Sequence, residues 1–222
     1  MVIWFRSETI ITTVVDNGRS SQYHFVTKSS RSEMAYARLF TLMERLGNLT
    51  QASLRTAGQL HALQPVPLLV LSFLAKANRY SDTPAAVADY LGLSRAATSQ
   101  TLGLLEERGL IERTQDGVDR RVWRLRLTLG GRSVVDGILP PAEWSAALEL
   151  MGSEEAARLE ASLESLLRAT QRANGSRSFG ECRSCCHFLS DKGAGNRCGL
   201  TQEPLSSSQI VRICREHAFA LD

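Results

Sequence analysis

The chain has 222 residues, of which 43% are hydrophobic and 22% are charged, and its formal net charge at pH 7 is +3. This length allows one compact domain with an appendage, and so small a positive charge does not by itself indicate a nucleic-acid partner. No apolar run approaches the roughly 18 residues that a membrane span needs, and the first residues lack a signal-peptide pattern. We therefore expect a cytoplasmic protein without a membrane partner.

The first third of the chain changes from an ill-defined pattern to a helical one. Residues 1–33 form a lead to which we assign no function. From Met34 to Leu60, apolar residues recur every three or four positions, which predicts an amphipathic helix. Residues 64–78 follow with two prolines and an apolar body, and they predict a buried helix.

Two short helices joined by a tight turn are predicted next. Thr83 is a favoured N-cap residue, Pro84 suits the first helical position, and Gly92 suits the end of the first helix. Ser94 is the N-cap candidate of the second helix. This order predicts a helix-turn-helix motif, in which the start of the second helix faces a DNA groove.

The second helix has a core face and an outward face. Thr98, Leu102 and Leu105 fall on one stripe and are predicted to face the core. The residues that then face outward near the helix start are Arg95, Ala96, Ser99, Gln100 and Gly103. A glycine within a helix costs about 1 kcal/mol relative to alanine, and the sequence offers no reason for Gly103.

After this helix the apolar period changes to two. Residues 110–128 read as two strands, with the turn signal Asp116-Gly117 between them. A two-stranded ribbon directly after a helix-turn-helix describes a winged helix. Helical patterns then resume, break at Pro140-Pro141, and end in a last helix for which Ser153 is the predicted cap.

The proposed DNA-binding unit concentrates positive charge in arginine. Residues 92–132 contain eight arginines, no lysine and five acidic residues, a local balance of +3. Arginine suits the recognition of phosphates and guanine edges because its guanidinium is planar and weakly hydrated. The alternative is that these arginines form a solvated face. For Arg120 and Arg121, at the tip of the ribbon, we favour contact with the minor groove.

Residues 91–131 resemble the core of MarR-type winged-helix transcriptional regulators. The residues that carry the resemblance are Leu93-Ser94, Leu105 to Leu110, Asp119-Arg120-Arg121, Leu127-Thr128 and Gly131. It extends over about residues 34–172. It implies a mainly α fold with a small β-wing, in which N- and C-terminal helices flank the winged helix and join two copies.

The resemblance also implies a function and a set of contact residues. The expected function is repression, by a homodimer bound to a double-stranded DNA operator. The residues expected to contact the grooves are Arg95, Ser99 and Gln100 on the helix and Arg120 and Arg121 on the wing, with Asp119 orienting a wing arginine. The sequence leaves open whether a small-molecule effector also binds. The chain departs from the family pattern at two places: Ala96 and Ala97, which leave base specificity to apolar contacts and DNA shape, and Gly103 inside the recognition helix.

Two other classes of function compete with a regulator. One is a nucleic-acid-processing enzyme, and the other is a protein-docking module that uses the winged helix for a protein partner. The sequence contains no Gly-rich phosphate loop, no paired catalytic carboxylates and no HExxH motif, so we expect no enzyme. The arginine-tipped wing favours DNA over a protein partner.

All five cysteines lie in the last part of the chain, residues 173–222, which we read as a linker and a cysteine-rich tail. So short a segment cannot bury enough apolar area to fold alone, whereas a bound metal would link its distant parts. The predicted ligands are the thiolates of Cys182, Cys185, Cys198 and Cys214. Substitutes are Cys186 and, less favoured, His187 or His217.

The spacing of the cysteines bears on the kind of metal centre. Only one Cys-x2-Cys pair is present, Cys182 with Cys185, whereas zinc sites usually combine two such pairs. Irregular spacing is common for iron–sulfur clusters, which we favour, with zinc and a metal-free thiol–disulfide switch as alternatives. Because the tail follows the last helix, we expect the centre to act on the dimer interface and so on half-site spacing.

Overall fold

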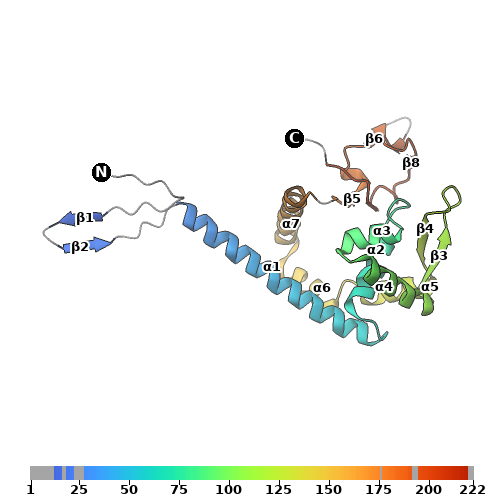
Figure 1. Cartoon of the computed structure of the whole chain (residues 1–222), viewed down its shortest axis with the longest axis horizontal. Coiled ribbons are helices and arrows are strands. Elements are labelled where there is room, and N and C mark those ends of the chain that lie inside the picture. Colours follow the sequence, from blue (N-terminus) through green and yellow to red (C-terminus); the bar gives the residue numbers. More distant parts are fainter. Residues whose placement is uncertain (1–12, 17–18, 23–27, 176, 192–194, 220–222) are drawn as a thin grey trace. The chain divides into compact units, whose positions relative to one another are not determined.

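The computed structural model describes residues 13–16, 19–22, 28–175, 177–191 and 195–219. The chain divides into two compact units, Met1–Ala52 and Ser53–Asp222. The first unit contains an antiparallel hairpin and most of a long helix (Figure 1), with the elements β1 (Thr13–Asp16), β2 (Arg19–Gln22) and α1 (Lys28–Gln59). Helix α1 confirms the predicted helix and begins earlier, inside the predicted lead. The rest of that lead, residues 1–12, 17–18 and 23–27, lies outside the described residues.

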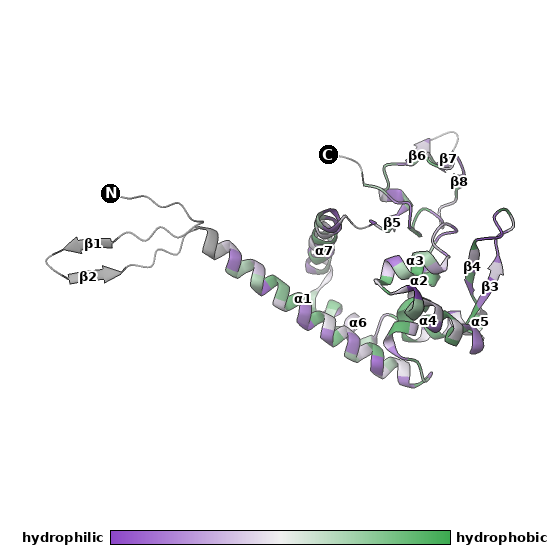
Figure 2. Ribbon diagram, viewed as in Figure 1, coloured by the Kyte–Doolittle hydropathy of each residue, from purple (hydrophilic) through white to green (hydrophobic). Residues whose placement is uncertain are grey.

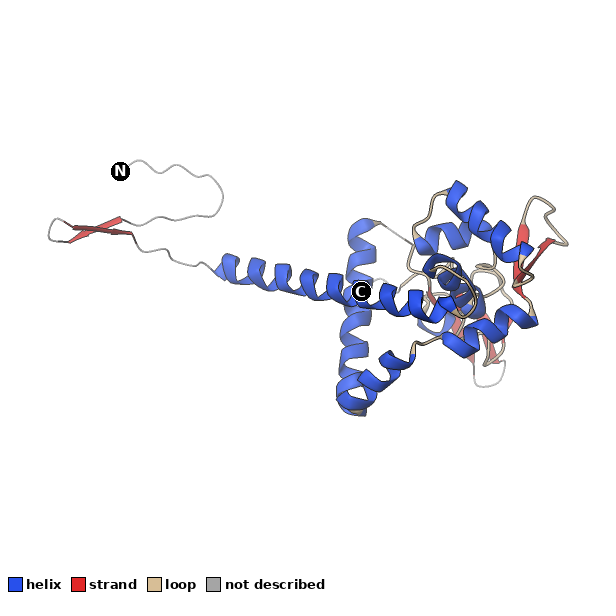
Figure 3. Ribbon diagram, turned by 90° about the horizontal axis from the view of Figure 1, so that it is seen from below, coloured by secondary structure: helices blue, strands red, loops and turns tan. Residues whose placement is uncertain are grey.

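The second unit contains the predicted helix-turn-helix and its wing. Its elements, in chain order, are α2 (Pro65–Lys76), α3 (Pro84–Leu91), α4 (Arg95–Glu107), β3 (Ile111–Gln115), β4 (Trp123–Leu127) and α5 (Leu129–Ile138). Strands β3 and β4 pair antiparallel with Arg113 opposite Leu125. Figure 3 shows this hairpin as a ribbon attached to a group of helices. The fold is a winged helix-turn-helix, as the sequence predicts.

The predicted helix signals of the motif are confirmed in atomic detail. The Thr83 side chain accepts a hydrogen bond from the Ala86 N–H, and Gly92 ends α3 in the left-handed conformation with φ of 64°. The Ser94 side chain accepts from the Ala97 N–H at the start of α4. These caps satisfy backbone donors that a helix start leaves without partners.

One hydrophobic core holds the winged helix together. Helix α2 is apolar along most of its length (Figure 2), and seven of its residues are buried. Leu102 and Leu105 of α4, Leu125 of β4 and Val134 of α5 pack into the same cluster. The core therefore fixes the orientation of α4 and the wing relative to each other.

Two further helices, α6 (Ala142–Met151) and α7 (Ser153–Asn174), follow the winged helix. The predicted break at Pro140-Pro141 lies between α5 and α6. The predicted cap at Ser153 is wrong: Gly152 ends α6 and also precedes the first turn of α7, which leaves Ser153 inside the helix. Among the described residues, no helix is long and apolar enough to cross a membrane.

The cysteine-rich tail forms two small sheets. Its elements are β5 (Gly180–Glu181), a 3-10 turn (Cys182–Ser184), β6 (Phe188–Asp191), β7 (Gly195–Cys198), β8 (Pro204–Leu205) and β9 (Ile213–Cys214). Strand β5 pairs with β9, and β6, β7 and β8 form the other sheet in that order. Phe179 and Ile213 pack against the core of the winged helix. The tail thus gains apolar burial from its neighbour that it could not gain alone.

Candidate nucleic-acid interface and cysteine site

Helix α4 presents the start of its outer face to solvent. The predicted groove residues Arg95, Ser99 and Gln100 are exposed, and Ala96 lies exposed among them. On the opposite face Thr98 is 3% exposed, and Leu102 and Leu105 are fully buried. The buried face holds the helix in place, so the exposed residues form a fixed surface on an α-helix, an element that a major groove admits.

The wing tip holds one arginine in a defined orientation. The Arg121 Nε and Nη2 atoms each donate a hydrogen bond to an Asp119 carboxylate oxygen, both at 3.0 Å. The Arg121 side chain nevertheless remains 91% exposed. This bidentate pairing raises the pKa of Arg121 and lowers the pKa of Asp119. The predicted wing residues are therefore adjacent, and the neighbouring Arg120 is also exposed.

Asp116 shapes the turn that carries this tip. Its Oδ1 accepts hydrogen bonds from the backbone N–H groups of Asp119 and Val118 at 3.0 and 2.9 Å. These two donors, together with the Arg124 guanidinium, lower the pKa of Asp116 to about 2. The turn signal seen in the sequence thus has a specific cause: an aspartate bonded to the backbone just after it.

The eight arginines of residues 92–132 fall into two groups. Some are engaged within the chain: Arg108 donates to the carbonyl oxygens of His61 and Ala62, Arg113 lies 3.4 Å from Glu106, and Arg124 pairs with two aspartates. In the described part of the chain, four have no ion pair, namely Arg95, Arg120, Arg126 and Arg132. With Arg121, these four are the arginines available to a nucleic acid.

Arg124 is an anchor that the sequence reading missed. Its guanidinium lies 2.7 Å from an Asp116 carboxylate oxygen and 2.9 Å from an Asp82 carboxylate oxygen, and it also donates to the Arg79 carbonyl oxygen. All three charged side chains are about four-fifths buried. Burial raises the pKa of Asp82 more than the contact with Arg124 lowers it. The contact ties the wing to the loop before α3, and no local pattern signals it.

The four predicted thiolate ligands line one small cavity in the tail. Its walls include Cys182, Cys185, Cys198 and Cys214, together with His187. Cys182 and Cys214 are both 8% exposed. None of the five cysteines, all of which the structure describes, forms a disulfide. The tail therefore brings together residues that are up to 32 positions apart in the sequence.

Two of these thiols interact directly. A hydrogen bond between Cys182 and Cys214 raises the pKa of Cys182 and lowers the pKa of Cys214 to about 6. The pKa of Cys185 is raised, mainly by burial. Across the residues that the structure describes, no three His, Cys, Asp or Glu side chains already converge in the arrangement of metal ligands.

Of the three substitute ligands named from the sequence, His187 lines the same cavity, whereas Cys186 and His217 occupy other surroundings. Cys186 is exposed, and it is not among the residues that line the cavity. His217 is 5% exposed, with Nδ1 2.5 Å from the Ser178 hydroxyl and Nε2 3.0 Å from the Ser184 hydroxyl. Both of its ring nitrogens are thus engaged, and burial lowers the pKa of His217. Its role in this arrangement is to bridge segments of the tail.

Comparison with known proteins shows which family and which solved structures the central segment resembles. Residues 63–122 match the model of the MarR family. A MarR transcriptional regulator from Methanosarcina mazei Go1 has 19% identity and a TM-score of 0.55, over 62% of this chain and 99% of its own. The DNA complex of MepR from S. aureus gives 19% identity and a TM-score of 0.50, over 58% and 96%. A search among curated proteins found no match.

The structural likenesses confirm the predicted fold class, a mainly α winged helix-turn-helix with a small β-wing. The matched segment contains α2, α3, α4, β3 and the wing tip, and it stops before the cysteine-rich tail.

Proposed function

We propose that the chain is a transcriptional regulator, most simply a repressor, that binds double-stranded DNA as a homodimer and catalyses no reaction. The observation that carries this proposal is the combination, within one rigid module, of the exposed start of α4 and the Arg121 side chain held by Asp119. The match of residues 63–122 to the MarR family supports it, as does the structural similarity to the MepR complex with DNA.

In this proposal the two exposed elements enter different grooves. Helix α4 lies in the major groove, where Arg95, Ser99 and Gln100 reach base edges and phosphates. The wing lies along the backbone, and Arg121 enters the minor groove with Arg120 beside it. Arg121 loses little freedom on binding, because Asp119 already orients it.

The dimer is supported by apolar side chains on the flanking helices. On α7, Leu159, Leu163, Leu166 and Leu167 recur at helical spacing and are 37% to 56% exposed. On α1, Leu39, Met43, Leu46 and Leu49 are 43% to 62% exposed. A second copy that covers these stripes would remove them from water and place two α4 helices on one DNA face.

The thiols of Cys182, Cys185, Cys198 and Cys214 are proposed to bind a metal centre, an iron–sulfur cluster with a zinc ion as the alternative. Support comes from the cavity that all four line and from the contact between Cys182 and Cys214. Rotation about χ1 moves each Sγ among three staggered positions, and binding of one metal centre would use such rotations to bring the four thiols together. Such a centre would make DNA binding responsive to iron or redox status.

A small-molecule effector has a candidate site beside this centre. A cavity of about 300 Å³ lies between β4, α2 and the tail, with Cys182 in its wall. Its lining combines apolar residues such as Leu125 with four arginines, Arg79, Arg126, Arg132 and Arg212. This composition suits an anionic molecule with an apolar body.

A salt-titrated binding assay tests the DNA-binding part of the proposal. The protein first selects duplexes from a random library. The association constant for a selected duplex should then fall steeply as salt is added. For each tenfold rise in salt concentration, its logarithm should fall by about 0.9 for every phosphate that the protein neutralises. Failure to select any duplex at low ionic strength would refute the regulator.

Purification without oxygen tests the cofactor. We expect a brown protein with iron, acid-labile sulfide and visible absorption, and replacement of Cys182 by Ala should abolish all three. Stoichiometric zinc without colour would favour the alternative. A protein that carries neither metal and gains none on reconstitution would contradict a metal centre.

A further inference from the structure

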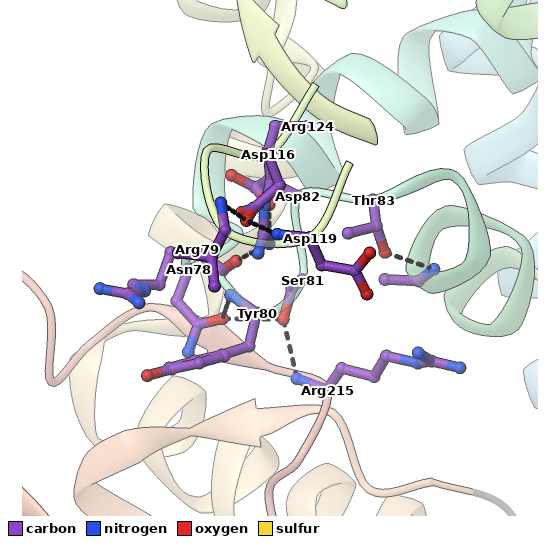
Figure 4. A network of polar contacts seen from close by, with 12 residues as sticks. Asn78, Arg79, Tyr80, Ser81, Asp82, Thr83, Asp116, Asp119, Arg124 and Arg215 are labelled. Carbon is purple, nitrogen blue, oxygen red and sulfur yellow. Dashed lines mark hydrogen bonds and ion pairs between the residues drawn. The ribbon is translucent and has the colours of Figure 1, made fainter. Parts of the chain in front are cut away.

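The cysteine-rich tail makes its polar contacts with the DNA-binding unit mainly at one loop. This α2–α3 loop, residues 77–83, connects the two helices that lead into the helix-turn-helix. The Asn78 N–H donates to the Ile213 carbonyl oxygen at 2.9 Å, and the Arg215 N–H donates to the Ser81 hydroxyl at 2.7 Å. Arg79 lies 2.9 Å from Glu203. Figure 4 shows the loop between the tail, which carries Arg215, and the wing.

Asn78 connects this loop to a predicted metal ligand. Its Nδ2 donates to the Cys182 Sγ at 3.9 Å, and its Oδ1 accepts from the Tyr80 N–H at 2.9 Å and from the Ser81 hydroxyl at 3.0 Å. Asn78 is 9% exposed, and Ser81 is fully buried. One buried side chain therefore contacts a cysteine sulfur with one end and organises the loop with the other.

The strength of the hydrogen bond from Asn78 to the Cys182 sulfur depends on whether that sulfur is a protonated thiol or a metal-bound thiolate. A neutral thiol is a weak acceptor, whereas a metal-bound thiolate accepts N–H hydrogen bonds as an anion does. Groups that donate to metal ligands orient them and are in turn held by them. The 3.9 Å separation leaves room for this contact to shorten when Cys182 becomes a thiolate.

The opposite side of the loop contacts the wing and helix α3, the first helix of the helix-turn-helix. The Asp82 carbonyl oxygen accepts from the Leu125 N–H of β4 at 2.7 Å, and its carboxylate pairs with Arg124. Thr83 caps α3. From the tail, Arg215 also reaches Asp89 on α3 at 2.6 Å. A loop that is ordered by the tail thus orders the wing base and the start of the helix-turn-helix.

We propose that Asn78 is the positioning residue through which the thiolate site controls the α2–α3 loop. As a result, the metal-loaded chain binds DNA with higher affinity than the metal-free chain. This inference rests on the metal centre of the proposed function. It assigns the regulatory contact to the DNA-binding unit itself, in addition to the dimer helices. The chain of contacts runs from Cys182 through Asn78 and Asp82 to Arg124 and the wing.

The test compares metal-loaded and metal-free full-length protein on one duplex selected by the wild type. The wild type is expected to lose at least tenfold in affinity on metal removal. Asn78→Asp keeps an oxygen for Tyr80 and Ser81 but presents a negative charge to Cys182, so the ratio of the two affinities should fall towards one. Asn48→Asp, on exposed α1, makes the same charge change and should keep the wild-type ratio.

A second variant and a second measurement keep the test decisive if Asn78→Asp folds or loads poorly. Ser81→Ala removes the hydrogen bonds of the Ser81 hydroxyl with the Arg215 N–H and with Asn78 Oδ1, and it touches no sulfur. This variant should load metal fully while its affinity ratio drops several-fold. Hydrogen exchange of the Leu125 amide should be slower in the loaded wild type than in the metal-free form, and Ser81→Ala should lose this difference.

The outcomes separate this inference from the proposed function. If metal-loaded and metal-free wild type bind DNA equally, or if both loop variants keep the wild-type ratio, the inference is wrong while the regulator and its metal centre stand. A chain that binds DNA but never binds iron or zinc overturns the inference together with the metal centre.

Discussion

At the scale of single residues, two glycines of the winged helix have opposite surroundings. A Cβ added to Gly131 at the start of α5 would lie 2.0 Å from the Leu110 carbonyl oxygen. A Cβ added to Gly103 in α4 would meet nothing within 4 Å. Gly131 is thus required for close packing of α5 on the turn between α4 and β3. Packing inside the chain does not explain Gly103, which leaves contact with DNA as a reason for a small residue there.

The same substitution should therefore have opposite effects at the two glycines. Gly131→Ala forces backbone apart and should lower the free energy of unfolding by about 1–3 kcal/mol. Gly103→Ala should raise it by about 0.5–1 kcal/mol, because alanine favours the helix. Urea unfolding of both variants checks this, and equal changes at the two positions would contradict the packing described for Gly131.

Asp116 predicts a specific dependence of stability on acid. Its pKa in the folded chain is about 2, below the ordinary value of 3.8. A lowered carboxylate pKa contributes stability above the unfolded value, and this contribution is lost as the pH falls towards the folded value. Asp116→Asn should therefore be less stable than the wild type at pH 5, and the difference should shrink between pH 4 and 2.

Urea unfolding across this pH range measures the difference in free energy of unfolding between the wild type and Asp116→Asn. The contributions of the other carboxylates cancel in this difference, because both proteins contain them. Glu112→Gln, an exposed change on β3, serves as the control and should give a nearly constant difference. A gap between wild type and Asp116→Asn that stays constant down to pH 2 would show that the turn does not depend on this carboxylate.

At the scale of elements, the wing shows how local chemistry presents a cation to solvent. Asp116 bonds to the backbone of the turn, and Asp119 holds Arg121. Arg124 joins the base of the hairpin to the α2–α3 loop. The hairpin is thus held at its tip and at its base. Arginines that only formed a solvated charged surface would not need such support.

Asp119→Ala provides a test in which two effects have opposite signs. Removal of a negative charge near DNA should strengthen binding by simple electrostatics. Loss of the orientation of Arg121 should weaken it, and we expect the weakening to dominate on a selected duplex. Arg121→Ala should weaken binding about tenfold and reduce the salt slope by about one. Tighter binding by Asp119→Ala on that duplex would show that orientation is unimportant.

At the scale of the whole molecule, the structure shows where the cysteine-rich tail docks on the rest of the second unit. The tail contacts the α2–α3 loop, and it also contacts α7, where Gln171 donates to the Ser178 carbonyl oxygen at 2.8 Å. The predicted action of the metal centre on the dimer interface through the last helix stays a prediction, beside the proposed route through Asn78.

The apolar stripe of α7 predicts an effect on assembly. Leu163→Glu with Leu167→Glu places two charges in the proposed interface, and the protein should become monomeric and lose affinity for a selected duplex. Ala161→Glu adds a charge beside Glu164 and Arg168 on the other side of α7 and should leave the dimer intact. Light scattering after gel filtration checks both, and a dimeric double variant would place the interface elsewhere.

Signals within a few residues of each other were enough to predict the central elements. Thr83 and Ser94 cap helices because their side chains bond to N–H groups three positions ahead, and alternation around Leu125 marks β4. The predicted cap at Ser153 failed because two helices share Gly152, a crowding that single-helix rules do not include. The prediction that further helices flank the winged helix depended on the family resemblance of residues 91–131.

The sequence by itself therefore determined the order of elements, the caps, the outward face of α4 and the cluster of cysteines, since each depends on neighbours along the chain. Only the tertiary structure decided that Asn78 meets Cys182, 104 positions away, and that Arg215 meets Asp89, 126 positions away. Such pairs leave no periodic pattern, because they arise when the tail buries Phe179 and Ile213 against the core of the winged helix. That burial joins the cysteine site to the DNA-binding unit.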